Sequence, residues 1–265
     1  LPTARTRMLI SRSLRFAARL STHARTPAQQ HQFALYEALA ARDASDEMLQ
    51  TANSALTCHP RGPRRELPMP NRRKSDVDEP AFRRLIDDVA AADECARARA
   101  AIRAALQHED GPERLLSPYA FEAALGPLDA AFVQALAFRL ETAVRREVAT
   151  ITGATLRPAG LLVNYLSGVG DGSELRPSSG PFAPHCDRAN RDSYDVSALL
   201  YLSTAGEHFS GGGEFAFNDD DRDRLVEPRE GRVLLFSSGF ENLHQVRPMA
   251  DGERFTVSAW YSRTT

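Results

Sequence analysis

The sequence of 265 residues has few cysteines, a single tryptophan and no long hydrophobic run. Its three cysteines, Cys58, Cys95 and Cys186, fit no disulfide framework and indicate a reducing compartment. The pair Cys58-His59 lacks the four ligands that a structural zinc site requires. No apolar stretch approaches the length of a membrane-spanning helix, so we expect no transmembrane segment. These absences argue against disulfide-rich scaffolds and zinc modules.

Acidic residues are missing from the first 36 positions, which contain six arginines; Glu37 is the first acid. Between Met8 and Leu20, arginines alternate with apolar residues at near-helical spacing. Such an Arg-rich, Ser-containing, acid-free start is typical of an organellar transit peptide. We therefore expect mitochondrial localisation, with a plastid as second choice and the cytoplasm if this arm is no targeting signal. The alternative is a basic tail or an arm, residues 1–36, that binds a protein complex.

The next segment, residues 37–80, is expected to hold short helices followed by a basic, proline-rich linker. Five prolines between His59 and Pro80 favour a linker over a folded unit. Its arginines and lysine lack interleaved aromatic residues and a recognisable binding motif, so nucleic acid is not an expected partner.

Residues 81–265 are expected to form one domain, with support helices over 81–150 and a β-rich core over 155–263. Helices are predicted for Ala81–Gln107 and Leu128–Thr150. The second has one apolar stripe with Pro127 in its first turn; the stripe comprises Leu128, Phe132, Leu136, Leu140 and Val144. Segments rich in β-branched, aromatic and aliphatic residues predict strands, at Val196–Leu202, Gly213–Phe217, Arg232–Phe236 and Phe255–Tyr261.

Chemistry-bearing residues gather near the C-terminus. His185 and Asp187 are two positions apart, so in a strand their side chains point to the same side and can bind one metal ion. His244 would add a third ligand from a distant strand. Two histidines and one carboxylate hold non-haem Fe(II) and leave coordination positions open for substrate and O2. Arg254 offers a planar fork for a carboxylate. The combination indicates an oxygenase.

The sequence around these residues resembles the prolyl-hydroxylase branch of the Fe(II)/2-oxoglutarate dioxygenases. Matching stretches are Pro184-His185-x-Asp187, Ser197–Leu202, Gly212–Phe215, Phe236-Ser-Ser-Gly-x-Glu-Asn-x-His244-x-Val246 and Gly252-x-Arg254. The stretch that ends at His244 is similar to the leprecan, or prolyl 3-hydroxylase, type. The resemblance implies an α+β fold with a double-stranded β-helix, or jelly-roll, core buttressed by N-terminal helices.

The resemblance also implies roles for single residues. His185, Asp187 and His244 would bind Fe(II), and Arg254 would pair with the distal carboxylate of the cosubstrate 2-oxoglutarate. Thr256 lies on the same side of its strand as Arg254 and would support that contact. Tyr165 matches a tyrosine that helps to hold the cosubstrate, with a core tyrosine as the alternative. For Tyr201 we expect core packing. Ascorbate is a further implied cofactor.

The expected function is hydroxylation of a C–H bond, with succinate and CO2 as co-products. A prolyl residue in a protein other than collagen is the first substrate class, while other peptidyl residues and small molecules remain open. The alternative is a dioxygenase fold that serves as an accessory or structural subunit of an organellar complex. Its basic N-terminal third, with thirteen Arg and Lys against five Asp and Glu in residues 1–75, would anchor it.

Overall fold

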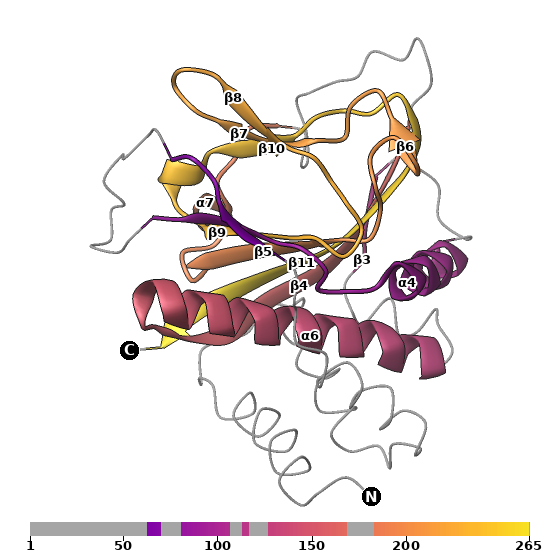
Figure 1. The fold of residues 1–265 in the computed structure, drawn as a ribbon, viewed down its shortest axis with the longest axis horizontal. Coiled ribbons are helices and arrows are strands. Elements are labelled where there is room, and N and C mark those ends of the chain that lie inside the picture. The colour runs from indigo at the N-terminus through magenta and orange to yellow at the C-terminus, as the bar shows by residue number, and fades with distance from the viewer. Residues whose placement is uncertain (1–62, 70–80, 107–112, 117–126, 169–182, 265) are drawn as a thin grey trace, which may run out of the picture.

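The computed structural model describes residues 63–69, 81–106, 113–116, 127–168 and 183–264 (Figure 1). The arm over 1–36 and the first part of the segment 37–80, where short helices are expected, lie outside these residues. No helix in the described ranges is long and apolar enough to cross a membrane.

The larger of two sheets is antiparallel throughout, and its strands come from both ends of the chain (Figure 1). In spatial order it contains β1 (Arg64–Glu66), β2 (Arg83–Ile86), β9 (Val233–Ser237), β5 (Val196–Tyr201), β11 (Asp251–Thr264), β4 (Thr155–Ser167) and β3 (Glu113–Leu116). A short strand, β6 (Phe209–Ser210), pairs with the first residues of β11. Strands distant in sequence are therefore neighbours in space.

The smaller sheet lies across from the larger one in Figure 1. It has the order β10 (His244–Val246), β7 (Phe215–Asn218) and β8 (Asp223–Val226). Two short helices, α7 (Asp187–Asn190) and η2 (Phe240–Asn242), lie in the connections between strands. This arrangement confirms the predicted α+β fold with a jelly-roll core, and all four predicted strands are present with shifted ends.

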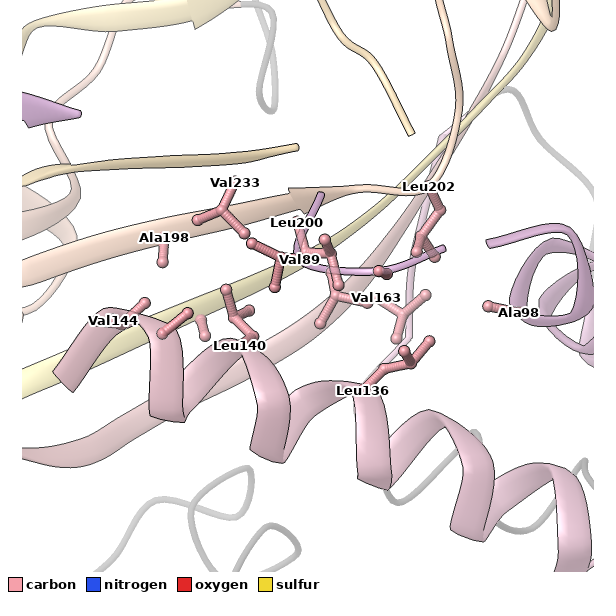
Figure 2. Packing of buried hydrophobic residues seen from close by; sticks show 14 of the residues in the cluster. Val89, Ala98, Leu136, Leu140, Val144, Val163, Ala198, Leu200, Leu202 and Val233 are labelled. Carbon is pink, nitrogen blue, oxygen red and sulfur yellow. The ribbon is translucent and has the colours of Figure 1, made fainter. Parts of the chain in front are cut away.

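Helix α6 (Pro127–Thr152) begins at Pro127 as predicted and runs along the outer face of the larger sheet (Figure 1). Its residues Leu136, Leu140 and Val144 pack against outward side chains of that sheet, as Figure 2 shows for Ala198 and Leu200 of β5. Proline fits the first turn because its missing N–H has no intrahelical partner there. Phe132, Leu136, Leu140 and Val144 of the predicted apolar stripe thus lie on the buried face of the helix.

The helix predicted for Ala81–Gln107 is wrong in its first third. Arg83–Ile86 forms β2, and helix α4 covers only Ala92–Ala105. Asp88, with a φ of 57°, separates the two elements. The reason is tertiary: β2 pairs with β9, a strand that lies about 150 residues further along the chain.

The region expected to be a linker contains β1, which pairs with β2 through Arg64–Glu66. Tertiary pairing therefore extends the sheet into part of the proline-rich stretch. Leu67 also packs against the apolar cluster between the sheets.

Three consecutive glycines, Gly211–Gly213, connect β6 to β7 with φ of 68°, 123° and 82°. A Cβ on Gly212 would lie 1.8 Å from the carbonyl oxygen of Pro248, so the backbones approach too closely for a side chain. This glycine turn joins the two sheets.

Candidate metal centre and cosubstrate site

The three predicted metal ligands come together in the described structure. Nε2 of His185 lies 3.7 Å from Oδ1 of Asp187, and Nε2 of His244 lies 3.8 Å from the same oxygen. The candidate ligand atoms all lie within 4.8 Å of one another. Reciprocal main-chain hydrogen bonds of 2.8 and 2.9 Å join His185 to His244. The backbone thus fixes the spacing of the two imidazoles.

The expectation of a strand through His185 and Asp187 needs a correction. Asp187 is the first residue of α7, and only Cys186 between them is extended, with φ −119° and ψ 136°. One extended residue is enough to turn the side chains at either end to the same side. Cys186 is buried and points away from the triad by the same alternation.

Both imidazoles are held in one tautomer by main-chain carbonyls. Nδ1 of His185 lies 2.8 Å from the oxygen of Ala183, and Nδ1 of His244 lies 2.7 Å from the oxygen of Asn242. A carbonyl oxygen can only accept, so each Nδ1 carries the proton and donates it. Each Nε2 is then left with a lone pair, as a metal ligand requires.

Asp187 is oriented by a pair of buried hydroxyls. Ser197 donates to Oδ2 of Asp187 at 2.5 Å, and the hydroxyls of Ser197 and Ser238 are 2.6 Å apart. Oδ1, the oxygen nearest both Nε2 atoms, is the remaining ligand position. The serines act as the hydrogen-bond partners that ligating carboxylates commonly have.

His244 has an aromatic surround. Phe215 stacks on its ring with centroids 4.8 Å apart, and Phe236 meets it edge-on at 5.1 Å. Burial lowers the pKa of His244 to about 4, although the charge of Asp187 acts in the opposite direction. The imidazole is therefore neutral at physiological pH, which is the form that binds metal.

Arg254 is 2% exposed and points to the same face of the larger sheet as Thr256. Its Nη1 donates to the hydroxyl of Thr256 at 3.0 Å, while its Nε and Nη2 have no hydrogen-bond partner. The hydroxyl of Tyr201, whose ring centroid is 5.4 Å from Cζ of Arg254, is also buried without a partner. Burial lowers the pKa of Arg254 and raises that of Tyr201 to about 12.

A buried cation with two unused donors beside an unused hydroxyl is costly unless an anion satisfies them. The carboxylate of a small dicarboxylic acid has the matching geometry, because it accepts two parallel hydrogen bonds from a guanidinium. These three donors therefore fit the distal carboxylate of 2-oxoglutarate. The two imidazoles and one carboxylate fit Fe(II) with open positions.

The structure does not bring Tyr165 to this site. Its hydroxyl donates to Oε1 of Glu253 at 3.0 Å, and its ring packs on Phe255 among the residues that face the helices. Arg254 and Phe255 are adjacent in β11, so their side chains lie on opposite faces. The predicted cosubstrate role of Tyr165 thus conflicts with the strand alternation, and its placement fits the alternative of a core tyrosine.

Sequence reasoning missed two residues of the site, Ser197 and Tyr201. Both lie on β5 with side chains on the inner face, four residues apart. The expectation of core packing for Tyr201 holds for its ring, which is fully buried among aromatic residues, but not for its hydroxyl. Only the pairing of Tyr201 with Thr256 across β5 and β11 places that hydroxyl near Arg254.

Comparison with known proteins agrees with this geometry. Residues 174–262, which contain the whole triad and Arg254, match the model of the 2OG-Fe(II) oxygenase superfamily. Over these residues the chain is similar to that superfamily. Over 75 residues the chain is 45% identical to 2-oxoglutarate and iron-dependent oxygenase domain-containing protein 3 of Xenopus tropicalis. That match covers 28% of this chain and 23% of the relative.

Prolyl 3-hydroxylase 2 of Gallus gallus is 39% identical over 71 residues, which are 26% of this chain and 10% of that protein. The chain therefore spans less than a quarter of the length of either relative. Its fold resembles a prolyl hydroxylase from Trichoplax adhaerens, solved in complex with a peptide fragment of hypoxia inducible factor. The TM-score is 0.51 at 17% identity, with 67% of this chain and 82% of that chain covered. The chain thus shares its fold with that prolyl hydroxylase.

Proposed function

We propose that this protein is an Fe(II)- and 2-oxoglutarate-dependent hydroxylase of a peptidyl residue, with a prolyl residue as the first substrate class. The observation that carries the proposal is the presence of two sets of side chains, one suited to a metal ion and the other suited to a carboxylate. A His, Asp and His set faces a common point, and the buried Arg254 has two unused donors beside the unused hydroxyl of Tyr201. No buried dry core would retain such groups for stability alone.

Each side chain has a distinct task in this proposal. His185, Asp187 and His244 would hold Fe(II), and the carbonyls and serines behind them keep the ligand atoms aimed at the metal. Arg254, Thr256 and Tyr201 would hold the distal carboxylate of 2-oxoglutarate and so fix its orientation. When bound, Fe(II) and 2-oxoglutarate supply the oxidising chemistry that hydroxylates a C–H bond and releases succinate and CO2.

The apolar surround has its own part in the proposed chemistry. Phe215 and Phe236 shield the His244 side of the centre from water, while the side chain of His185 is 27% exposed. Substrate would thus approach from the His185 side. Ascorbate, as a general reductant, would return the iron to Fe(II) after an uncoupled cycle.

The peptidyl, prolyl substrate class is supported by the sequence around His244 and by the identity to a prolyl 3-hydroxylase. The fold adds support because a peptide-bound prolyl hydroxylase shares it. The connection from Asp187 to β5 is short, only Arg188–Asp195, and includes α7. Loops in this place often shape a substrate groove, so we do not propose collagen as the substrate.

The deciding experiment is anaerobic titration of the full chain with Fe(II) and 2-oxoglutarate. The chelate of a keto acid on Fe(II) gives a weak visible charge-transfer band, which requires both ligands on one metal. We expect the band in the wild type and its loss in His185→Ala. Tyr165→Phe is the matched control, because Tyr165 lies on the other face of the sheet and should leave the band unchanged.

Turnover is then tested by succinate release with a library of proline-containing peptides. Release that depends on peptide and on Arg254 supports the proposal. A folded protein without the charge-transfer band at high ligand concentration would contradict it. In that case an accessory subunit with a dioxygenase fold, docked through the basic arm over 1–36, becomes the better account.

We also propose mitochondrial localisation from the acid-free, Arg-rich sequence of residues 1–36. Fusion of these residues to a fluorescent protein tests the proposal in cells. Import and cleavage support it; a cytoplasmic signal contradicts it, and plastid import would replace it. A variant with the six arginines changed to glutamine is the control, and we expect it to remain outside the organelle.

A further inference from the structure

A buried ion pair lies behind the metal centre, outside the predicted ligand set. Arg83 on β2 is 1% exposed, and its guanidinium grips Asp219, which follows β7. Nη1 donates to Oδ2 at 2.9 Å and Nη2 donates to Oδ1 at 2.7 Å. A buried ion pair is a weak source of stability, because desolvation of both charges offsets their attraction. We therefore expect a role of the Arg83–Asp219 pair other than stabilisation of the fold.

The other donors of Arg83 reach the segment that carries His244. Nε donates to Oδ1 of Asn242 at 2.6 Å, and Nη2 also donates to the carbonyl of Glu241 at 3.3 Å. Nη1 donates as well to the carbonyl of Pro68 at 3.1 Å. One planar side chain thus binds two consecutive residues of η2, which lysine could not do with the same geometry.

Asn242 is held at both ends of its amide. Its Nδ2 donates to the carbonyl and the hydroxyl of Ser237, at 2.7 and 2.9 Å, while Oδ1 accepts from Arg83. Its main-chain oxygen is the acceptor for Nδ1 of His244 at 2.7 Å. The group that selects the tautomer of His244 is therefore fixed by Arg83.

A second contact leads from Arg83 to the same imidazole. Its Cζ lies 3.8 Å from the ring centroid of Phe217, whose Cα is the ladder partner of His244. Phe217 meets Phe215 and Phe236 edge-on, and those two rings flank His244. Polar and aromatic contacts thus converge on one ring.

We propose that Arg83, supported by Asp219, is a positioning residue that holds His244 in the Nδ1–H tautomer and in the orientation for metal binding. The inference rests on the proposed function for the role of His244 as a ligand. It adds a dependence of the centre on β2, a strand that lies outside residues 174–262. Without β2, residues 174–262 would then hold His244 in the wrong orientation for metal binding.

The first test uses the metal-free full chain and does not depend on the proposed function. Long-range ¹H–¹⁵N correlation spectra at neutral pH report the tautomer of each histidine. The wild type should show His244 only as Nδ1–H. The double variant Arg83→Met/Asp219→Asn removes both charges of the pair and should show both tautomers. Arg224, which also donates to Asp219 at 3.1 Å, keeps its ion pair with Asp221 in this variant. An unchanged His244 signal in this variant overturns the inference.

The control is a second ion pair, on the helix side of the sheet, between the buried Arg139 and the partly buried Glu94. Arg139 donates to both carboxylate oxygens of Glu94, and Arg139→Met/Glu94→Gln removes that pair. A purely structural role for Arg83 predicts similar losses of Tm in both double variants with no tautomer change in either. Positioning predicts a tautomer change in the Arg83 variant only.

The second test is the affinity for Co(II), with the d–d absorption spectrum as readout. Loss of a group that orients a ligand costs about 10- to 100-fold in metal affinity. We expect that loss for Arg83→Met/Asp219→Asn and not for the control. If the wild type itself binds no metal, the proposed function fails, while the tautomer result still decides this inference.

Asn242→Ser keeps the inference testable if the double variant does not fold. It removes the contact with Arg83 but retains the ion pair and the main-chain carbonyl. The expected result is again a mixture of tautomers and weaker Co(II) binding. Wild-type tautomer and affinity in this variant would show that the network does not position His244.

Discussion

The two faces of the larger sheet differ in chemistry although they belong to the same strands. In β11, Phe255, Val257 and Ala259 face the helices and pack in an aliphatic core with α4 and α6. Arg254, Thr256 and Ser258 alternate with them and face the other sheet. In β5, Ala198 and Leu200 face the helices, while Ser197 and Tyr201 face the site. A period of two residues lets one strand serve both purposes.

The helix-side face is where burial yields stability without polar cost, because its contacts are mostly between aliphatic groups. The inner face contains paired charges, serine hydroxyls and unused donors, all of which cost desolvation. The comparison suggests that substitutions on the two faces will separate stability from ligand binding. Each prediction below is a test of that separation.

The largest effect on stability is expected for Leu200→Ala. Leu200 is fully buried on the helix side of β5, close to Leu140 of α6 (Figure 2). Truncation of such a leucine lowers the free energy of unfolding by about 2–5 kcal/mol. Urea unfolding measures this loss, and the affinity for 2-oxoglutarate of the folded fraction should remain at the wild-type value. A comparable loss of affinity would show that the two faces are not separable.

For Arg254→Met we expect weaker 2-oxoglutarate binding without a loss of stability, which is nearly the opposite of the result for Leu200→Ala. Loss of two charge-assisted hydrogen bonds to a carboxylate should weaken 2-oxoglutarate binding by about 3 kcal/mol, or roughly a hundredfold. The metal-free protein should be no less stable than the wild type, because a buried guanidinium with unused donors has been removed. Calorimetric titration and thermal unfolding measure the two quantities. A large drop in Tm would mean that Arg254 stabilises the fold.

A smaller effect is expected for Tyr201→Phe. The ring and its packing remain, so only one hydrogen bond to the cosubstrate is lost, about 1 kcal/mol or roughly fivefold in affinity. Tyr165→Phe is the control, since it removes a hydroxyl of the same kind from the opposite face. Equal effects of the two variants on 2-oxoglutarate affinity would contradict the assignment of faces.

The smallest expected effect is on the pH dependence of Tm, and it involves Glu94 on the helix side of the sheet. Burial raises the pKa of Glu94, but hydrogen bonds from Arg139 and the N–H of Ala91, with the charge of Arg139, outweigh it and hold the pKa below 4.5. A lowered folded-state pKa means that this stabilisation is present above about pH 4.5 and is lost as the pH falls through the folded value. The Tm of Glu94→Gln should therefore fall less steeply below pH 4.5 than that of the wild type. Identical pH profiles would contradict the prediction.

Much of the site was readable from the sequence because its ligands lie in short local patterns. The spacing of His185 and Asp187 puts two ligands on one side of the chain whether or not a regular strand forms there. The match around His244 and Arg254 then supplied the remaining residues. The strands were readable for a similar reason, since β-branched and aromatic runs mark segments such as β5 and β9.

Parts that depend on pairing between distant segments were not readable. Arg83–Ile86 has no strand signal of its own in an alanine- and arginine-rich region, and it becomes β2 because β9 offers an unpaired edge. Which face of the sheet Tyr165 and Tyr201 occupy depends on strand register, and a single sequence does not reveal the register. A shift of one residue would move each side chain to the opposite face.

The sequence by itself determined the chemical inventory: two histidines and a carboxylate for a metal, an arginine for a carboxylate, and a β-rich core with supporting helices. Tertiary structure alone decided which tyrosine meets Arg254 and that Arg83 lies behind His244. The physical reason is range. Ligand spacing and strand propensity are properties of neighbouring residues, whereas these contacts across a sheet join segments more than 50 residues apart in the sequence.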